Sequence, residues 1–451
     1  MLESIAAMVL KIALGLLGLG VVVFVHELGH FLAARMVGIG VDAFSIGWGK
    51  PIFKRKIGEV EYRQGMFPMG GYCTMRGGSE LKGVADGQKP EPGTYFGSSP
   101  LRRIAVCLAG PFFNIVFAAL LFSVVWGGGR EFGTFGNRIV LASDLTGVPA
   151  PADAAGLRSG DRIVSIDGKP VRYWHEMRET ILLNAGRPLA LVLERDGETL
   201  NLSVTPDLDR NSGAGLIGVL PWKDTLVAGI RPDSDAAIAG LRPGDRIVRV
   251  NGEETVNDVQ VLRILEGRPG ILDVDFVRDG AESGLRVIVS GDGDTGILWP
   301  VITYRTPRLS LPAALVRGAE ESWRTLAVSV RGLSLLFRGI DLTKAVSGPL
   351  RITYMVGDVA TSGFGEGLIG GLRSMADFLA LISIALGVMN LLPLPVLDGG
   401  QIVLFVVEAV RRKPTHPKVL GIFQTAGIVI ICALMVFALF GDIVFLGGRL
   451  G

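Results

Sequence analysis

Two histidines and a glutamate near the start of this 451-residue chain have the spacing of a metal-dependent hydrolase. Residues 26–30 read H-E-L-G-H, and this pentapeptide holds two of the four histidines in the chain. On a helix, His26 and His30 lie on the same side, so both imidazoles can bind one metal ion. Glu27 lies beside the first histidine and can take a proton from a water molecule that the metal activates. The alternative is a chance pattern, which the cost of burying these groups in hydrocarbon argues against.

A catalytic zinc site needs a third protein ligand, and Asp398 is the candidate. The remaining histidines, His175 and His416, lie in segments predicted outside the membrane. An acidic residue at the bilayer centre costs roughly 2.5–3.5 kcal/mol and therefore marks a functional position. The prolines and glycines around Asp398 would break its helix and turn the carboxylate inward. The alternative is that Asp398 only marks the end of a span. Because the two histidines lack a partner, we predict one Zn2+ held by His26, His30 and Asp398, with Glu27 catalytic. Ligand type alone does not separate zinc from other divalent metals.

The elements that must position these residues are membrane helices. The chain is 49% apolar and has a mean hydropathy of +0.45. Runs of about 20 apolar residues predict four spans. We place them at 7–37 with the H-E-x-x-H motif, 103–126, 376–408 as a broken helix, and 419–446. A signal peptide is the alternative for the first run, but no basic cluster precedes it. The expected fold is an α-helical multi-pass membrane protein with inserted α+β domains.

Lysine and arginine enrichment places the loop 38–102 and the short loop before 419 in the cytoplasm. The long segment after the second span then lies outside, and the metal site lies near the cytoplasmic side. A net charge of +2 gives no support for a nucleic-acid partner. The three cysteines, Cys73, Cys107 and Cys432, predict no disulfide framework.

The external segment contains a repeat. Residues 154–171 and 238–255 are identical at 10 of 18 positions, with an offset of 84 residues. Each copy combines a Gly-Asp turn, a β-rich run and an Asp-Gly or Asn-Gly hairpin signal. This layout resembles the permuted PDZ domain of bacterial proteases, and we predict two such domains at 137–207 and 213–292. Gly215 and Gly218 lie in a loop that resembles the site for a peptide carboxylate. The alternative is a pair of domains that only occludes the active site.

Three further segments are candidates for substrate contact or support. Residues 308–345 predict an amphipathic helix on the outer membrane surface, with a solvated linker helix as the alternative. Residues 60–75 predict a β-hairpin or β-loop near the membrane, where Gly70 and Gly71 present backbone to a substrate; an ordinary loop is the alternative. Asn390 is equally a substrate-binding or a helix-packing residue. Asn114 is expected to brace neighbouring helices through a hydrogen bond.

The order of these motifs resembles the site-2 protease family of intramembrane zinc metalloproteases. The order is H-E-L-G-H, A-G-P-x-x-N at 109–114, two PDZ-like copies, and N-x-x-P-x-P-x-x-D-G-G from Asn390. Gln401 follows the last glycine, where relatives often have histidine. The resemblance implies zinc binding by His26, His30 and Asp398, catalysis by Glu27, and substrate contact by the β-loop 69–75.

The resemblance also implies the substrates and the compartment. It implies cleavage of single-pass membrane proteins, such as an anti-sigma factor already trimmed by another protease, and of signal-peptide remnants. It places the protein in the inner membrane, with periplasmic PDZ-like domains that exclude bulky external domains. The competing functions are a non-catalytic membrane PDZ scaffold that binds peptide tails and a zinc-dependent chaperone or transporter. An intact Glu27 with all three ligands favours the protease.

Overall fold

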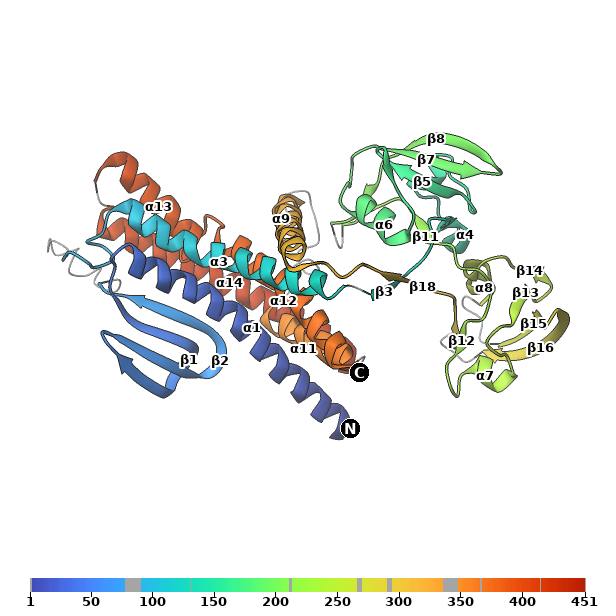
Figure 1. The fold of residues 1–451 in the computed structure, drawn as a ribbon, viewed down its shortest axis with the longest axis horizontal. Coiled ribbons are helices and arrows are strands. Elements are labelled where there is room, and N and C mark those ends of the chain that lie inside the picture. The colour runs from blue at the N-terminus through green and yellow to red at the C-terminus, as the bar shows by residue number, and fades with distance from the viewer. Residues whose placement is uncertain are drawn as a thin grey trace. The chain divides into compact units, whose positions relative to one another are not determined.

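The computed structural model describes residues 2–77, 91–129, 131–210, 213–265, 270–289, 294–335, 348–365, 367–413 and 415–450. The chain forms two compact units (Figure 1). The first combines 1–130 with 307–451, and the second comprises Glu131–Thr306. The second unit is therefore an insertion between the helices of the first.

The first unit is a bundle of long helices. Its helices are α1 (Leu2–Met36), α3 (Pro100–Gly127), α9 (Leu311–Leu335), α11 (Pro349–Gly365), α12 (Leu368–Asn390), α13 (Asp398–Arg411) and α14 (Pro417–Leu450). Four of them contain segments long and apolar enough to cross a membrane, namely Val9–Met36, Pro100–Gly127, Leu368–Asn390 and Lys418–Ile443. These segments confirm a membrane protein with four candidate spans. The predicted break in the third span is also present, since α12 ends at Asn390 and α13 begins at Asp398.

Small residues let the helices of this unit cross closely. A side chain at Gly15 of α1 would collide with the backbone of Thr353 in α11, and one at Gly357 would collide with Lys11. Membrane helices associate through such small-residue contacts because lipid provides no hydrophobic driving force between them. The sequence analysis did not predict α11. At its start, Asp442 of α14 accepts hydrogen bonds from backbone N–H groups including those of Gly348 and Leu350.

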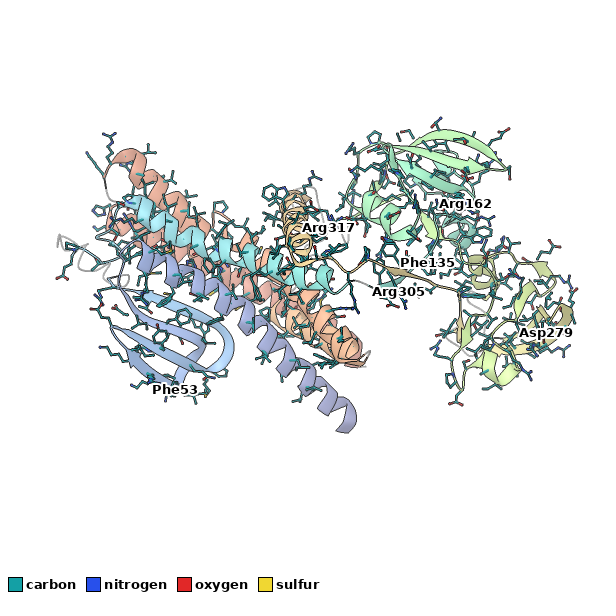
Figure 2. All side chains as sticks on the ribbon, in the orientation of Figure 1. Phe53, Phe135, Arg162, Asp279, Arg305 and Arg317 are labelled. Atoms are coloured by element: carbon teal, nitrogen blue, oxygen red, sulfur yellow. The ribbon has the colours of Figure 1, made fainter. Side chains whose placement is uncertain are left out.

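The amphipathic segment predicted at 308–345 contains the helix α9, which carries Arg317 (Figure 2). One face of α9 packs on α3. A side chain at Gly318 would collide with Ala119, and the Ser322 hydroxyl donates to the Ile115 carbonyl at 3.2 Å. The helix is therefore anchored to the bundle. The predicted segment also includes Phe337, which lies outside the described residues.

The predicted β-loop belongs to a larger sheet in the segment 38–102. The strand β2 (Val60–Met75) pairs with β1 (Val41–Ile57), a strand that the sequence analysis did not predict. Residues of β1 pair on both sides, because Phe44 lies opposite both Tyr62 and Cys73. The last part of β2, residues 71–75, pairs only with residues 41–46. One side of this segment is therefore a sheet edge.

The second unit contains two β-domains with the same strand order. The first sheet has the order β6-β5-β7-β8, and the second has the order β14-β13-β15-β16. The first domain contains α5 (Pro151–Ala154), β5 (Arg162–Ile166), β6 (Lys169–Pro170), α6 (Trp174–Leu182), β7 (Leu189–Arg195) and β8 (Glu198–Val204). The second contains α7 (Asp235–Ala239), β13 (Arg246–Val250), β14 (Glu253–Glu254), α8 (Asp258–Leu265), β15 (Gly270–Arg278) and β16 (Ala281–Val289).

A short pair of strands closes each β-domain. In the first, β4 (Ile139–Leu141) pairs with β11 (Val219–Pro221); in the second, β12 (Gly229–Ile230) pairs with β17 (Ile297–Leu298). Ile217 is buried in the first core, so the loop at 215–219 closes the first domain. This placement differs from the expected boundaries, which assigned the loop to a second domain starting at 213. The motif is ambiguous in sequence because it lies midway between the two repeats.

Five remaining elements complete the second unit. The two-residue strands β9 (Asp207–Leu208) and β10 (Gly215–Leu216) pair beside the first core. The strand β3 (Glu131–Thr134) pairs with β18 (Ile302–Arg305), so the first and last strands of the inserted unit form one ribbon. The short helix α4 (Ser143–Thr146) follows β4.

Candidate metal centre

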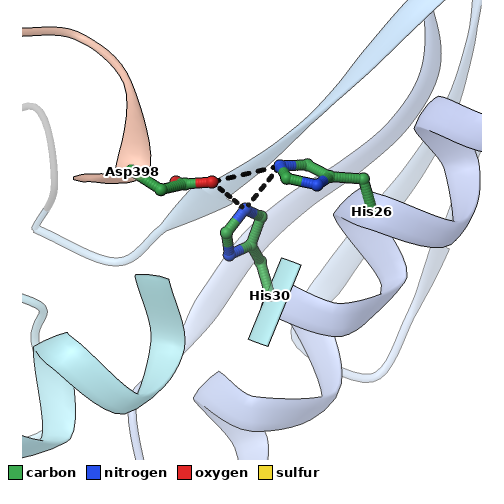
Figure 3. Close-up of side chains that lie close together, drawn as sticks. All are labelled: His26, His30 and Asp398. Atoms are coloured by element: carbon green, nitrogen blue, oxygen red, sulfur yellow. Dashed lines mark hydrogen bonds and ion pairs between the residues drawn. The ribbon is translucent and has the colours of Figure 1, made fainter. Parts of the chain in front are cut away.

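Three of the predicted site residues meet at one point in the helical unit (Figure 3). The Nε2 atoms of His26 and His30 lie 3.2 Å apart. The Oδ2 atom of Asp398 lies 3.2 Å from Nε2 of His26 and 3.5 Å from Nε2 of His30. The two imidazoles come from consecutive turns of α1, and the carboxylate comes from the first residue of α13. His26 and Asp398 are 372 positions apart in sequence, yet their ligand atoms and that of His30 lie together.

The chemistry of these atoms fits a zinc ion. Buried polar atoms in folded proteins almost always have a hydrogen-bond partner. Oδ2 of Asp398 is buried, yet it has no partner with acceptable hydrogen-bond geometry, although both imidazoles are close. Three facing nitrogen and oxygen atoms with lone pairs match the two-histidine, one-carboxylate set of catalytic zinc sites.

Hydrogen bonds to the far side of each ring orient the imidazoles. Nδ1 of His30 lies 2.8 Å from the carbonyl oxygen of Val106, so Nδ1 carries the proton and Nε2 is free for a metal. Nδ1 of His26 lies 3.2 Å from the Asn114 carboxamide, whose Oδ1 atom is buried without a partner. Because the O and N positions of an amide are an assignment, turning this carboxamide lets Oδ1 accept from Nδ1 of His26. Asn114, expected only to brace helices, therefore contacts a metal-ligand candidate.

Two glycines make room for the imidazoles between α1 and α3. A side chain at Gly110 would lie 2.6 Å from Cε1 of His30 and 2.8 Å from Cε1 of His26. A side chain at Gly29, inside the H-E-x-x-H motif, would lie 2.5 Å from the Ala109 carbonyl oxygen. Both distances are far below a normal carbon contact, so only glycine fits at either position. The sequence analysis quoted Gly110 within A-G-P-x-x-N but gave it no role.

The break between α12 and α13 turns Asp398 toward the histidines. A side chain at Gly399 would collide with the carbonyl of Leu391, and one at Gly400 would collide with that of Leu394. The two glycines therefore let residues 391–397 fold back against the first turn of α13. Val396 has a φ of 79°, a conformation that is rare for a β-branched residue.

A cavity of about 620 Å3 adjoins these three residues. Glu27 lines it, and so does Cys73 of β2. Asn390 and Gly71, two of the candidates for substrate contact, also line the cavity. Gly70 does not: it packs against the Trp48 ring with a φ of 84°.

Other predicted and unpredicted residues take different positions. Gly215 and Gly218 belong to the first β-domain of the second unit. Gln401 lines the cavity, and so does Gln424 of α14, which the sequence analysis missed. The signal that could have revealed Gln424 is a carboxamide within an otherwise apolar span. The three cysteines are unpaired, as expected.

Comparison with known proteins assigns the chain to a family. The model of peptidase family M50 matches residues 14–434. A Treponema pallidum protein named as a zinc metalloprotease is 36% identical, and the alignment covers 97% of this chain and 99% of the relative. The regulator of sigma E protease of Haemophilus influenzae is 30% identical over 95% of this chain and 97% of its own. Protease RseP of Yersinia pestis is 29% identical over 96% and 98%.

The matches extend over nearly the whole chain, and His26, His30 and Asp398 lie close enough together to hold one metal ion. Together they establish the enzyme class and the cofactor. The chain belongs to peptidase family M50 and is a membrane-embedded zinc metalloprotease.

Proposed function

We propose that this metalloprotease is an intramembrane endopeptidase that cuts single-pass membrane proteins in or near their transmembrane segments. The observation that carries the proposal is the position of the site. His26, Glu27 and His30 lie within the apolar segment Val9–Met36, and Asp398 follows the apolar segment Leu368–Asn390. A hydrolytic site on candidate membrane spans suits a substrate that is itself in the membrane.

In this proposal His26, His30 and Asp398 would hold the zinc ion, which would supply Lewis-acid activation of a water molecule and of the scissile carbonyl. Glu27 takes the proton from the attacking water and delivers it to the leaving amine. Glu27 lines the cavity and lies close to Gly71 of β2. Val106 and Asn114 hold the two imidazoles with their Nε2 atoms toward Asp398. A transmembrane helix must unwind before its peptide bonds reach these groups.

The edge segment 71–75 supports a way to hold the unwound substrate. It lines the cavity and pairs with β1 on one side only. An extended peptide can add to such an edge by main-chain hydrogen bonds. We assign Gly71 to this contact. Gly70 would act indirectly, by allowing the chain to pack against Trp48.

We also propose that the β-domains are PDZ-like and limit access by substrates with large external domains. Their matched strand orders and closing strands support a permuted PDZ fold. Gly218 has a φ of 77° in the loop that resembles a carboxylate site, and Gly215 lies at its start. The proposed location is the bacterial inner membrane with these domains in the periplasm. The proposed substrate class includes an anti-sigma factor after a first cleavage, and signal-peptide remnants.

The test is cleavage of a single-pass protein with a short external domain by purified protein in detergent. The wild type should cut it, and a zinc chelator should stop the reaction. Glu27→Gln should abolish cleavage while zinc remains bound, because Glu27 is assigned to proton transfer and not to metal binding. A version of the substrate with a large folded external domain should be cut more slowly.

Two results would contradict the proposal. If the protein cut water-soluble peptides but none of a panel of membrane substrates, an intramembrane substrate would be excluded. Undiminished cleavage by Glu27→Gln would remove the assigned base. The alternative function from the sequence, a non-catalytic scaffold, has no specific observation in its favour now that the enzyme class is established.

A further inference from the structure

Three carboxamide side chains line the cavity beside the metal-ligand candidates. Asn390 is the last residue of α12, Gln401 lies on the first turn of α13, and Gln424 lies on α14. In the part of the chain that the structure describes, none of these three carboxamides has a side-chain hydrogen bond. All three are partly buried. Polar groups inside a membrane are costly unless they find a partner, so a ligand is a natural candidate for one.

The face of α14 that carries Gln424 is fixed against the site. Gly427 lies one turn further along the helix, and a side chain there would collide with Pro395 in the break before Asp398. Leu420, one turn earlier, is buried with Cys107 and Phe405. Residues spaced three and four apart share one helix face. Packing on both sides of Gln424 therefore holds its carboxamide toward the cavity and away from lipid.

Gln401 also lines the cavity. It lies three residues after Asp398 on α13, so the carboxylate and the carboxamide project from neighbouring positions of the same helix. Gln401 and Gln424 thus present two neutral polar groups from two helices. Glu27 and the edge segment 71–75 contribute further polar atoms to the cavity from α1 and β2.

We infer that Gln424, assisted by Gln401, binds the main chain of the unwound substrate and positions it for cleavage. This inference rests on the proposed intramembrane function. An unwound transmembrane segment exposes N–H and C=O groups that water cannot satisfy in hydrocarbon. A carboxamide offers both a donor and an acceptor, which matches a peptide group. It is also uncharged, so it tolerates many substrate side chains and reads the backbone instead. Gln424 is a positioning residue under this assignment, whereas Glu27 handles the proton.

The experiment measures binding of a fluorescent synthetic transmembrane peptide in detergent, in full-length protein carrying Glu27→Gln to prevent turnover. Gln424→Leu should weaken binding about three- to tenfold, the value of one hydrogen bond. The matched control is Thr425→Leu, which makes the same polar-to-apolar change at an exposed neighbouring position of α14. Zinc content should be equal in all variants. In the active enzyme, Gln424→Leu should raise KM more than it lowers kcat.

A second peptide series identifies the partner of Gln424. Each peptide has one backbone amide near the cleavage site replaced by an ester, which removes a single N–H. At one position the ester should weaken binding to the parent but add no further loss in Gln424→Leu. Equal losses in both proteins at every position would overturn the inference, as would equal effects of Thr425→Leu and Gln424→Leu. If enzyme with intact Glu27 cuts only soluble peptides, the proposed function fails and the inference fails with it.

Discussion

Buried charge is handled differently in the two units of this protein. In the first β-domain, Asp161 is 1% exposed and accepts two hydrogen bonds of 2.7 Å from Arg195. In the second, Asp245 is equally buried and accepts bonds of 2.6 and 2.7 Å from Arg278. The aspartates are those of the repeated Gly-Asp turn. Each β-domain therefore pairs the buried aspartate of this turn with an arginine of the same domain.

The helical unit also contains a buried ion pair, since Arg103 and Glu408 lie 2.6 Å apart and are both buried. The metal-ligand candidates differ. Asp398 lies beside two imidazoles with an orphaned oxygen, and the cavity next to it holds carboxamides without partners. The buried aspartates of the β-domains are paired with arginines and support the fold. The cluster of His26, His30 and Asp398 has an unpaired oxygen, which suits the binding of a ligand.

The largest expected effect comes from filling the space that the imidazoles need. Gly110→Ala should displace the His26 and His30 rings and lower zinc affinity and cleavage by at least about 100-fold, the upper range for losing a supporting contact. Metal content and cleavage rate are measured on the same protein. The control is Gly127→Ala on the same helix, where a new side chain meets only Ala314 at an ordinary 3.5 Å. Normal zinc binding by Gly110→Ala would contradict the site geometry.

The next largest effect is expected from breaking the ion pair between Asp245 and Arg278. Asp245→Asn leaves Arg278 without its counter-charge and should destabilise the second β-domain by about 3 kcal/mol, with zinc binding unchanged. Hydrogen exchange of strands β13 to β16 in the full-length protein reports this loss. Asp273→Asn is the matched control, because its pair with Arg286 is largely exposed and should contribute little. Equal effects of the two changes would show that burial does not distinguish the pairs.

The same pair predicts a pH dependence. Hydrogen bonding from Arg278 holds the pKa of the Asp245 carboxyl below its ordinary value of 3.8. A carboxyl with a lowered folded-state pKa stabilises the fold above its unfolded pKa and loses that contribution as the pH falls. Protection of the second β-domain should therefore decrease below about pH 4. Asp245→Asn should show a smaller decrease over that window; an unchanged decrease would assign it to other groups.

The smallest effect is expected from changing Asn114, and it tests whether this carboxamide supports the His26 imidazole. Asn114→Leu removes the partner of the His26 Nδ1 atom and should weaken zinc binding about tenfold. Asn114→Asp should retain zinc, because a carboxylate also accepts from the imidazole N–H. If Asn114→Leu and Asn114→Asp bind zinc equally well, the carboxamide only packs between helices.

Much of the site was predictable, because its residues are either close in sequence or energetically unfavourable in a membrane segment. The H-E-x-x-H spacing predicts two imidazoles on one helix face, and the isolated carboxylate of Asp398 stands out after an apolar run. The four spans follow from apolar run length. The prolines and glycines around Asp398 predict a broken helix, and residues 391–397 separate α12 from α13.

The remaining features depend on contacts between distant segments. Gly110 is indispensable only because His26 and His30 pack against it, and no spacing in sequence shows that contact. Gln424 becomes informative once Gly427 brings α14 onto Pro395. The pairing of β1 with both parts of β2 requires register information that a mixed β-rich segment does not provide. The loop at 215–219 could close either repeat until Ile217 is seen in the first core.

X-ray absorption at the zinc edge of the purified protein tests the central account most directly. Cys73 and Cys107 also line the cavity, so sulfur ligation is the competing arrangement. We predict one zinc per chain with two imidazole ligands and oxygen at about 2.0–2.2 Å, and loss of zinc in Asp398→Ala. A sulfur shell at about 2.3 Å, or full zinc retention in Asp398→Ala, would contradict the assignment of His26, His30 and Asp398.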